Sequence, residues 1–199
     1  MEELNHSLFE AINATEASDP LWIAVGQFCA VYLIYLVPII LVVGWLAGGD
    51  RLRRILLGTF FAIVVALGIS TIIGTLWPQP RPFVVPIGQT FLDYDATPAF
   101  PSNHATIMLT MALGLLFRQP TRWPGAVFLA ITIPVLWARI YVGVHFPLDM
   151  AGAIVLSLVC AGGVARWHQL LVDPVYDRLV HPLFAWLFAP LIKRGWVKG

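Results

Sequence analysis

The feature that most constrains this chain is an uncharged run, residues 21–47, in which most side chains are apolar. A transmembrane helix needs about 20 such residues, so this run can cross a bilayer and also tilt or bend. Pro38 marks the expected bend, because proline removes a backbone hydrogen bond from a helix. Only 12% of the 199 residues are charged, whereas soluble domains carry about 25%. The sequence therefore predicts a polytopic membrane protein.

Four further apolar segments follow, and three prolines between residues 78 and 82 end the first of them. We expect spans at 55–77, 102–117, 123–139 and 147–164, with Pro147 at the first helical position of the last one. The fold class predicted is all-α: a bundle of about five transmembrane helices forming a single integral membrane domain over residues 1–199.

The segments outside the spans also carry predictions. Residues 1–20 are acidic, with apolar side chains at helical spacing, which indicates a short amphipathic helix at the membrane surface. Residues 48–54 are predicted to form a tight basic loop, and residues 83–103 a loop long enough to hold a cap or a short helix. Residues 180–192 are too short and proline-broken for a confident span, so we expect them to lie along the interface.

Basic residues predict the orientation. Ten of the twelve Lys and Arg fall in residues 51–54, residues 118–122 or the region from Arg166 onward. Alternating spans put all ten on one side, which the positive-inside rule makes cytoplasmic. The opposite, extracytoplasmic face then receives three polar clusters from the outer ends of the spans. These clusters are Arg81-Pro82, Ser102-Asn103-His104 and residues 139–149.

Composition excludes several classes of function. A net charge of +1 and the lack of a Lys/Arg-rich run argue against nucleic-acid binding. Cys29 and Cys160 lie in apolar stretches without a second ligand at metal spacing, so we interpret them as small buried residues. Asp93 and Asp95 are interpreted as solvated loop acids rather than a cation site. No cofactor is predicted, and no signal peptide is expected to be removed.

The polar clusters suggest phosphate chemistry. His145 and Asp149 are four residues apart, so a carboxylate can fix the imidazole tautomer and leave the other ring nitrogen as a nucleophile or base. Arg81 and Arg139 offer planar donor forks that match phosphate oxygens. Ionisable groups at membrane depth are costly and are usually retained for function.

The middle cluster adds an anion site. Ser102 and the amides of Asn103 and His104 stand at a predicted helix N-terminus, which favours a negative charge, and His104 can protonate a leaving oxygen. Taken singly, Ser102 is interpreted as an N-cap and Arg139 as a side chain reaching lipid headgroups. The convergence of all the clusters on one membrane face favours the joint interpretation. The other histidines keep a structural interpretation: His6, His168 and His181.

These motifs resemble the signature of the type 2 phosphatidic acid phosphatase superfamily: Lys-x6-Arg-Pro, Pro-Ser-Gly-His and Ser-Arg-x5-His-x3-Asp. Arg81-Pro82, the run 101–104 and the set Arg139, His145 and Asp149 match it in order and spacing. More closely, the chain is similar to the bacterial undecaprenyl-diphosphate phosphatases associated with bacitracin resistance. That likeness is carried by Leu8-Phe9, Ile12-Asn13, Arg81-Pro82-Phe83, residues 143–150 and residues 194–197.

Three positions depart from the signature. Gly74 stands where the signature lysine falls, Asn103 replaces the glycine, and Ala138 replaces the serine. Gln79 is an auxiliary candidate, able to offer a neutral donor near the missing lysine. These departures bear on substrate preference more than on the class of reaction.

The resemblance implies a two-step, metal-free phosphoryl transfer. His145, oriented by Asp149, would attack the terminal phosphorus of a lipid diphosphate, and His104 would protonate the leaving lipid phosphate and then activate water. Arg81, Arg139 and Ser102 would stabilise charge on the phosphoryl oxygens. The implied substrate is undecaprenyl diphosphate, whose product is a lipid carrier reused in peptidoglycan synthesis at the bacterial cytoplasmic membrane.

Other functions remain open at this point. Within the same class, the chain could hydrolyse phosphatidylglycerophosphate, phosphatidate or another lipid phosphate. From another class, the same polar residues could serve a small lipid transporter. The gathering of polar groups at one face and the lack of an evident inverted repeat argue against a transporter, and the missing lysine argues against a halide-oxidising relative. Oligomeric state and the route of lipid entry are left open by the sequence.

Overall fold

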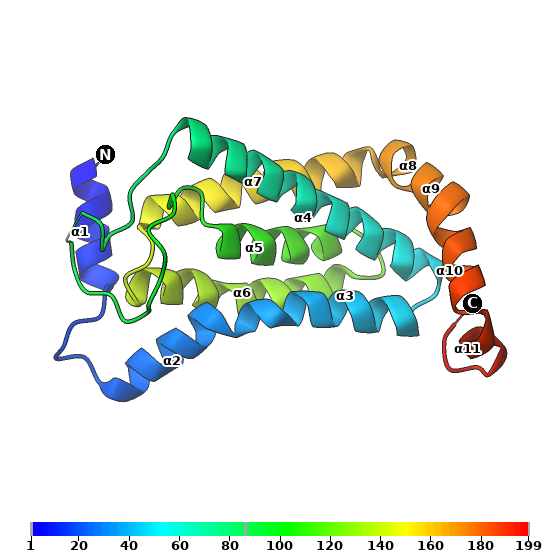
Figure 1. Cartoon of the computed structure of the whole chain (residues 1–199), viewed down its shortest axis with the longest axis horizontal. Helices are drawn as coiled ribbons and strands as arrows, with labels where there is room; N and C mark the ends of the chain where they lie inside the picture. Colours follow the sequence, from blue (N-terminus) through cyan, green and yellow to red (C-terminus); the bar gives the residue numbers. More distant parts are fainter. Residues whose placement is uncertain (1, 86, 199) are drawn as a thin grey trace.

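The computed structural model describes residues 2–85 and 87–198, which fold as helices and connecting segments without a β-strand in these ranges (Figure 1). This confirms the predicted all-α class. The longer helices are α1 (Glu2–Ile12), α2 (Pro20–Val31), α3 (Leu36–Ala47), α4 (Asp50–Leu76), α5 (Asn103–Leu116), α6 (Arg122–Tyr141) and α7 (Pro147–Arg166). Short segments complete the chain: α8 (His168–Leu171), α9 (Asp173–Val175), η2 (Tyr176–Val180), α10 (His181–Leu187) and α11 (Ala189–Lys193).

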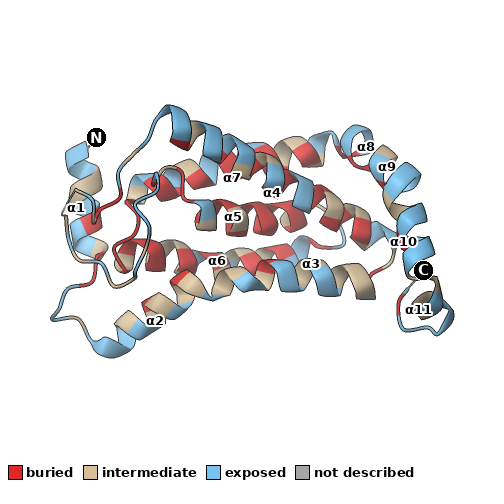
Figure 2. Cartoon of the chain, in the orientation of Figure 1, coloured by how far each residue is buried: buried red, intermediate tan, exposed pale blue. Residues whose placement is uncertain are grey.

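The bundle is built around α5. The rod formed by α2 and α3, together with α4, α6 and α7, supplies four segments long and apolar enough to cross a membrane. They enclose α5, whose side chains are mostly buried (Figures 1 and 2). At 14 residues, α5 is about 21 Å long, less than a bilayer core of about 30 Å. Because neighbouring helices shield it from lipid, α5 does not need that length, and the chain is a multi-pass membrane protein.

The first span bends one turn earlier than predicted. A 3-10 turn, η1 (Leu33–Tyr35), separates α2 from α3, and Pro38 lies in the first turn of α3. A proline ring clashes with the carbonyl four residues before it, which here belongs to Ile34. Pro38 therefore accounts for the bend, as predicted, but the bend lies at residues 33–35 rather than at the proline itself.

The predicted basic loop 48–54 was wrong. Only Gly48 and Gly49 separate α3 from α4, because α4 begins at Asp50 and carries the three arginines in its first two turns. Asp50 in the first turn is favourable there, since a helix N-terminus attracts negative charge. The short connection makes α3 and α4 antiparallel neighbours, so the predicted topology is unchanged.

One end of the bundle is covered by α1 and the irregular segment 77–102 (Figure 1). Phe9 of α1 is fully buried against Phe146, with ring centroids 5.1 Å apart. Asn13 fastens the helix end, because its side chain donates to the carbonyls of Gln89 and Tyr141 and accepts from the Gln89 amide. Thus α1 caps this end of the bundle rather than lying free on its surface.

Candidate active site

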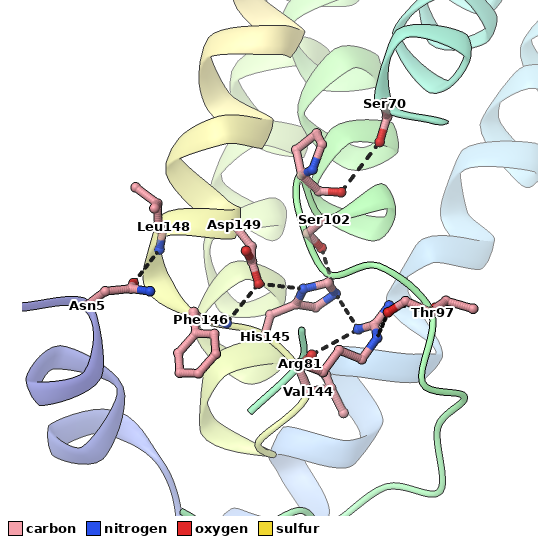
Figure 3. Close-up of polar contacts among 11 residues, drawn as sticks. Asn5, Ser70, Arg81, Thr97, Ser102, Val144, His145, Phe146, Leu148 and Asp149 are labelled. Atoms are coloured by element: carbon pink, nitrogen blue, oxygen red, sulfur yellow. Dashed lines mark hydrogen bonds and ion pairs between the residues drawn. The ribbon is translucent and has the colours of Figure 1, made fainter. Parts of the chain in front are cut away.

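The turn between α6 and α7 brings together two residues of the third cluster, His145 and Asp149. Gly143 has a φ of +82°, and a Cβ there would lie 2.0 Å from the Gln89 carbonyl oxygen, so glycine is required. After this turn His145 Nδ1 lies 3.0 Å from Asp149 Oδ2, which also accepts from the Phe146 amide at 2.9 Å (Figure 3). Both side chains are buried. The pairing predicted from their spacing is present.

The second ring nitrogen of His145 faces the other clusters. Nε2 lies 3.2 Å from Ser102 Oγ and 3.2 Å from Arg81 Nη1 (Figure 3). Burial, reinforced by the positive charges of Arg139 and Arg81, holds the pKa of His145 well below its usual value. The ring is therefore neutral. The carboxylate assigns the proton to Nδ1 and leaves the lone pair on Nε2.

Arg81 is fixed mainly by backbone carbonyls. Its Nε donates to the Thr97 carbonyl at 2.9 Å, Nη1 to the Val144 carbonyl at 2.9 Å, and Nη2 to Thr97 Oγ1 at 3.1 Å. The guanidinium carbon also lies 4.5 Å from the centre of the Tyr94 ring. The arginine is thus held rigidly beside His145.

Arg139 leaves donors free. It sits in the last turn of α6, is 1% exposed, and its Nη1 donates to the Ala30 carbonyl at 3.3 Å. Its Nε and Nη2 have no hydrogen-bond partner among the described residues. Buried donors are nearly always paired, so such a pair of nitrogens needs an explanation. A bound oxyanion would supply one.

The second cluster divides its side chains between two tasks. Ser102 stands at the N-cap of α5, but its hydroxyl makes no capping bond and points to His145 instead. Asn103 turns toward α4, where its Oδ1 accepts from Ser70 Oγ at 2.7 Å. His104 is half-buried on the first turn of α5, and its side chain makes no hydrogen bond within the described part of the chain. A free imidazole at this position can exchange protons.

At the position of the missing lysine, Gly74 lines a cavity of about 240 Å³ together with Ser70, Thr97 and Asn103. Gly74 is buried, and a Cβ there would meet Pro98 at 3.3 Å, so segment 77–102 packs directly on α4 at this point. Gln79 contributes its carbonyl, which accepts from the Ala99 amide at 2.9 Å. Its side chain bonds to none of the candidate residues in the described ranges, but it lines a nearby cavity with Asp149.

Sequence reasoning missed Tyr94 and Thr97. Both lie in the irregular segment between the first two motifs, where local patterns give no indication of which side chains turn inward. The only available signal was an aromatic residue between two acids in a loop close to charged motifs. Asp93 and Asp95 are exposed, consistent with the solvated interpretation given to them.

A cavity of about 250 Å³ lies between α1 and the site. Its wall is mainly apolar, with a polar edge from α1, and Asp149 lies in its lining. The apolar side chains are Trp77, Val85, Phe100, Phe146 and Leu148, and the polar edge includes Glu2, Asn5 and His6. A hydrophobic pocket with a few convergent polar groups is typical of a small-molecule site.

The arrangement as a whole suits an anionic electrophile. A neutral imidazole presents its lone pair beside two guanidinium groups and a hydroxyl, with a second histidine nearby. No cluster of three or more metal-ligating side chains occurs within residues 2–85 and 87–198.

Comparison with known proteins gives concordant results. The model of the PAP2 superfamily matches residues 55–173. The chain is 38% identical over its full length to "Putative undecaprenyl-diphosphatase YbjG" of Escherichia coli K12, covering 99% of that protein. It is 28% identical to "Undecaprenyl-diphosphatase BcrC" of Bacillus subtilis, over 90% of this chain and 95% of that one. The crystal structure of Aquifex aeolicus LpxE has a similar fold, with a TM-score of 0.64 and 22% identity over 82% of this chain and 95% of that chain.

Proposed function

Since the chain belongs to the PAP2 superfamily, we propose that it hydrolyses undecaprenyl diphosphate to undecaprenyl phosphate and inorganic phosphate. The observation that carries this proposal is the setting of His145. Its Nδ1 is bound to Asp149, and its Nε2 faces Ser102 and Arg81 beside the unpartnered donors of Arg139. The names of the two similar curated proteins supply the substrate.

In the first step, Nε2 of His145 attacks the terminal phosphorus. A P–N bond forms while the bond from phosphorus to the bridging oxygen breaks, and His104 gives a proton to that oxygen. The imidazole gains positive charge, which Asp149 stabilises through Nδ1. Two guanidinium groups and the Ser102 hydroxyl stabilise the negative equatorial oxygens, the electrostatic contribution that dominates phosphoryl transfer.

In the second step, water replaces the histidine. His104, now without its proton, takes one from the attacking water, and the P–N bond breaks to release inorganic phosphate. His145 returns to its neutral form with the proton still on Nδ1. Each turnover consumes one water and restores both histidines.

The setting in the membrane supports a lipid substrate. Ten basic residues lie in residues 51–54, in residues 118–122 or from Arg166 onward. The start of α4, the connection from α5 to α6 and helices α8 to α11, which contain most of them, lie at the end of the bundle opposite the site (Figure 1). With that end in the cytoplasm, the site faces the extracytoplasmic side of the bacterial inner membrane. The apolar cavity beside Asp149 suits the part of a polyprenyl chain nearest the phosphates. The product is a carrier that peptidoglycan synthesis can reuse, and sequestration of the substrate by bacitracin would be relieved by this activity.

The experiment is phosphate release by detergent-solubilised protein with a chelator present. The natural sequence and His145→Ala are compared, with His181→Ala as control, because His181 is half-exposed at the far end of the bundle. We expect release from undecaprenyl diphosphate to survive the control substitution and to vanish in His145→Ala. Phosphatidylglycerophosphate and phosphatidate are assayed in parallel.

Each other outcome has a defined meaning. Faster release from either glycerolipid would change the substrate within the phosphatase class. Equal activity in His145→Ala would refute the nucleophile assignment. No release from any lipid phosphate, with the protein intact in the membrane, would favour the lipid transporter instead.

A further inference from the structure

Both arginines of the site face the same aromatic ring. The guanidinium carbon of Arg81 is 4.5 Å from the centre of the Tyr94 ring, and that of Arg139 is 4.8 Å away. Both distances lie within the roughly 6 Å over which a ring attracts a cation. Two positive charges are therefore held close together, in a buried place, by one side chain that carries no negative charge.

The two arginines share this ring but have no carboxylate partner in the part of the chain that the structure describes. Within the described residues, neither arginine has a carboxylate oxygen within ion-pair distance. Burying an uncompensated charge is costly. A ring face lowers that cost, and the contact is worth most where water is excluded.

The geometry of the contact also leaves the donors free. A guanidinium stacked on a ring uses its face, while its N–H groups point outward in its plane. A carboxylate would instead accept those N–H groups and compete with a phosphate for them. The guanidinium carbon of Arg139 lies over the Tyr94 ring, and its Nε and Nη2 are buried and unpartnered among the described residues.

The segment that carries Tyr94 is fastened on both sides of it. The Phe91 amide donates to the Val142 carbonyl at 3.0 Å, and the Phe91 carbonyl accepts from Gln27 Nε2 at 2.7 Å. Beyond the tyrosine, Thr97 bonds to Arg81, and the Ala99 amide donates to the Gln79 carbonyl. The ring therefore has a fixed position relative to α6 and α4.

We infer that Tyr94 is a positioning residue, which holds Arg81 beside His145 and holds Arg139 with its unpartnered Nε and Nη2 available to the phosphoryl group. This inference rests on the proposed function and assigns a role to a residue outside the three sequence motifs. The ring stabilises the two cations where a carboxylate would neutralise them. In a chain with Gly74 at the signature lysine position, these two arginines carry the positive charge of the site.

Three substitutions of Tyr94 separate the contribution of the aromatic ring from that of the hydroxyl group and test the effect of a carboxylate. Tyr94→Phe keeps the ring, Tyr94→Leu removes it, and Tyr94→Glu introduces the carboxylate that the site lacks. The matched control is Tyr35→Leu, an exposed tyrosine in η1. Two quantities are measured: kcat/KM on undecaprenyl diphosphate, and the affinity for inorganic phosphate from competitive inhibition and from the rise in Tm that it causes. Circular dichroism checks the helix content of each variant.

We expect Tyr94→Phe and the control to stay within about threefold of the natural sequence in both quantities. Loss of a buried cation contact predicts a fall of about tenfold in Tyr94→Leu, equal in kcat/KM and in phosphate affinity. Tyr94→Glu should lose at least as much, because its carboxylate occupies the donors. If Tyr94 were only structural, a folded Tyr94→Leu variant would not lose phosphate affinity together with kcat/KM.

Other results would overturn the inference. If Tyr94→Leu keeps natural phosphate affinity, the ring does not position the arginines. If Tyr94→Phe loses as much phosphate affinity as Tyr94→Leu, the hydroxyl carries the effect instead of the ring. If Tyr94→Leu does not fold, Tyr94→Phe is compared with Tyr94→Glu, and equal losses in these two variants would also assign the effect to the hydroxyl. If the natural sequence binds phosphate with the expected order of variants but hydrolyses no lipid diphosphate, the proposed function fails and the role of Tyr94 stands.

Discussion

The two ends of the bundle both hold arginines but satisfy them differently. At the end formed by α4 and the C-terminal segments, Arg54 pairs with Asp173 at 3.3 Å and with Asp177. The neighbouring Arg53 lies 3.5 Å from Asp50 and donates to the Trp45 carbonyl at 3.0 Å. At the other end, Arg81 and Arg139 have no carboxylate partner in the described residues.

This difference separates cations that hold the fold together from cations that await a ligand. The paired arginines fasten α8 to α11 to the start of α4. The two arginines without a carboxylate partner, Arg81 and Arg139, lie near a neutral histidine and share an aromatic ring. Arg118 also buries two unpartnered nitrogens, so a free guanidinium is informative only where a nucleophile lies beside it.

Among substitutions that test the contrast between the two ends, Asp149→Asn is expected to have the largest effect on kcat. The amide can still accept from the Phe146 amide, but it no longer fixes the proton of His145 on Nδ1. In hydrolases with an Asp-oriented histidine such a change lowers kcat about 10⁴-fold, and we expect at least 10³-fold here. Steady-state phosphate release measures it. A loss below tenfold would show that His145 does not need the carboxylate.

Arg139→Met tests whether this arginine serves catalysis rather than stability. Removing a cation from the phosphoryl site should lower kcat/KM about 10²- to 10³-fold. Removing a buried charge that has no counter-ion should leave Tm unchanged or raised. Activity and thermal unfolding in detergent are measured on the same preparation. A large fall in Tm would mean that Arg139 has a structural role like that of Arg54.

The pH dependence of stability should carry the signature of His145. Its pKa is lowered in the folded state, so below about pH 6.5 the unfolded chain takes up a proton that the folded chain refuses. The contribution of His145 to stability is then complete above pH 6.5 and falls by about 1.4 kcal/mol per pH unit below it, as far as the folded pKa. The slope of denaturant unfolding against pH should diminish in His145→Gln. An unchanged slope would mean that His145 is protonated in the fold.

Arg54→Met should show the smallest effect, and on stability alone. Arg54 holds the pKa of Asp177 below its usual value, but the pair is partly exposed, and exposed ion pairs contribute little. We expect Tm to fall by at most about 3 °C and phosphate release to stay within twofold. A loss of activity beyond tenfold would mean that the two ends are coupled.

The sequence predicted the parts of the molecule that depend on composition and charge. Long apolar runs predicted the spans. The distribution of basic residues predicted that the three motifs lie at one end of the bundle. The spacing of His145 and Asp149 predicted their contact correctly, because four residues across a helix start bring two side chains together. Pro147 begins α7 as expected.

The sequence did not predict what depends on distant contacts. Tyr94 turns toward the arginines because Gln27 and Val142 hold its segment in place, and no local pattern contains those partners. The sequence placed Ser102 at a helix N-cap and among the groups that stabilise the phosphoryl oxygens, but it did not predict the 3.2 Å contact of its hydroxyl with His145 Nε2. The arginines of residues 51–54 entered α4 because the two glycines alone complete the turn.

The most direct measurement is to locate the phosphate on the enzyme during turnover. The natural protein is mixed with undecaprenyl diphosphate and quenched rapidly under alkaline conditions, which preserve phosphohistidine. Fragmentation mass spectrometry then identifies the phosphorylated residue. We expect the phosphate on His145, and none in His145→Ala. Phosphate on Ser102 or His104, or turnover by His145→Ala, would contradict the assignment of His145 as the nucleophile.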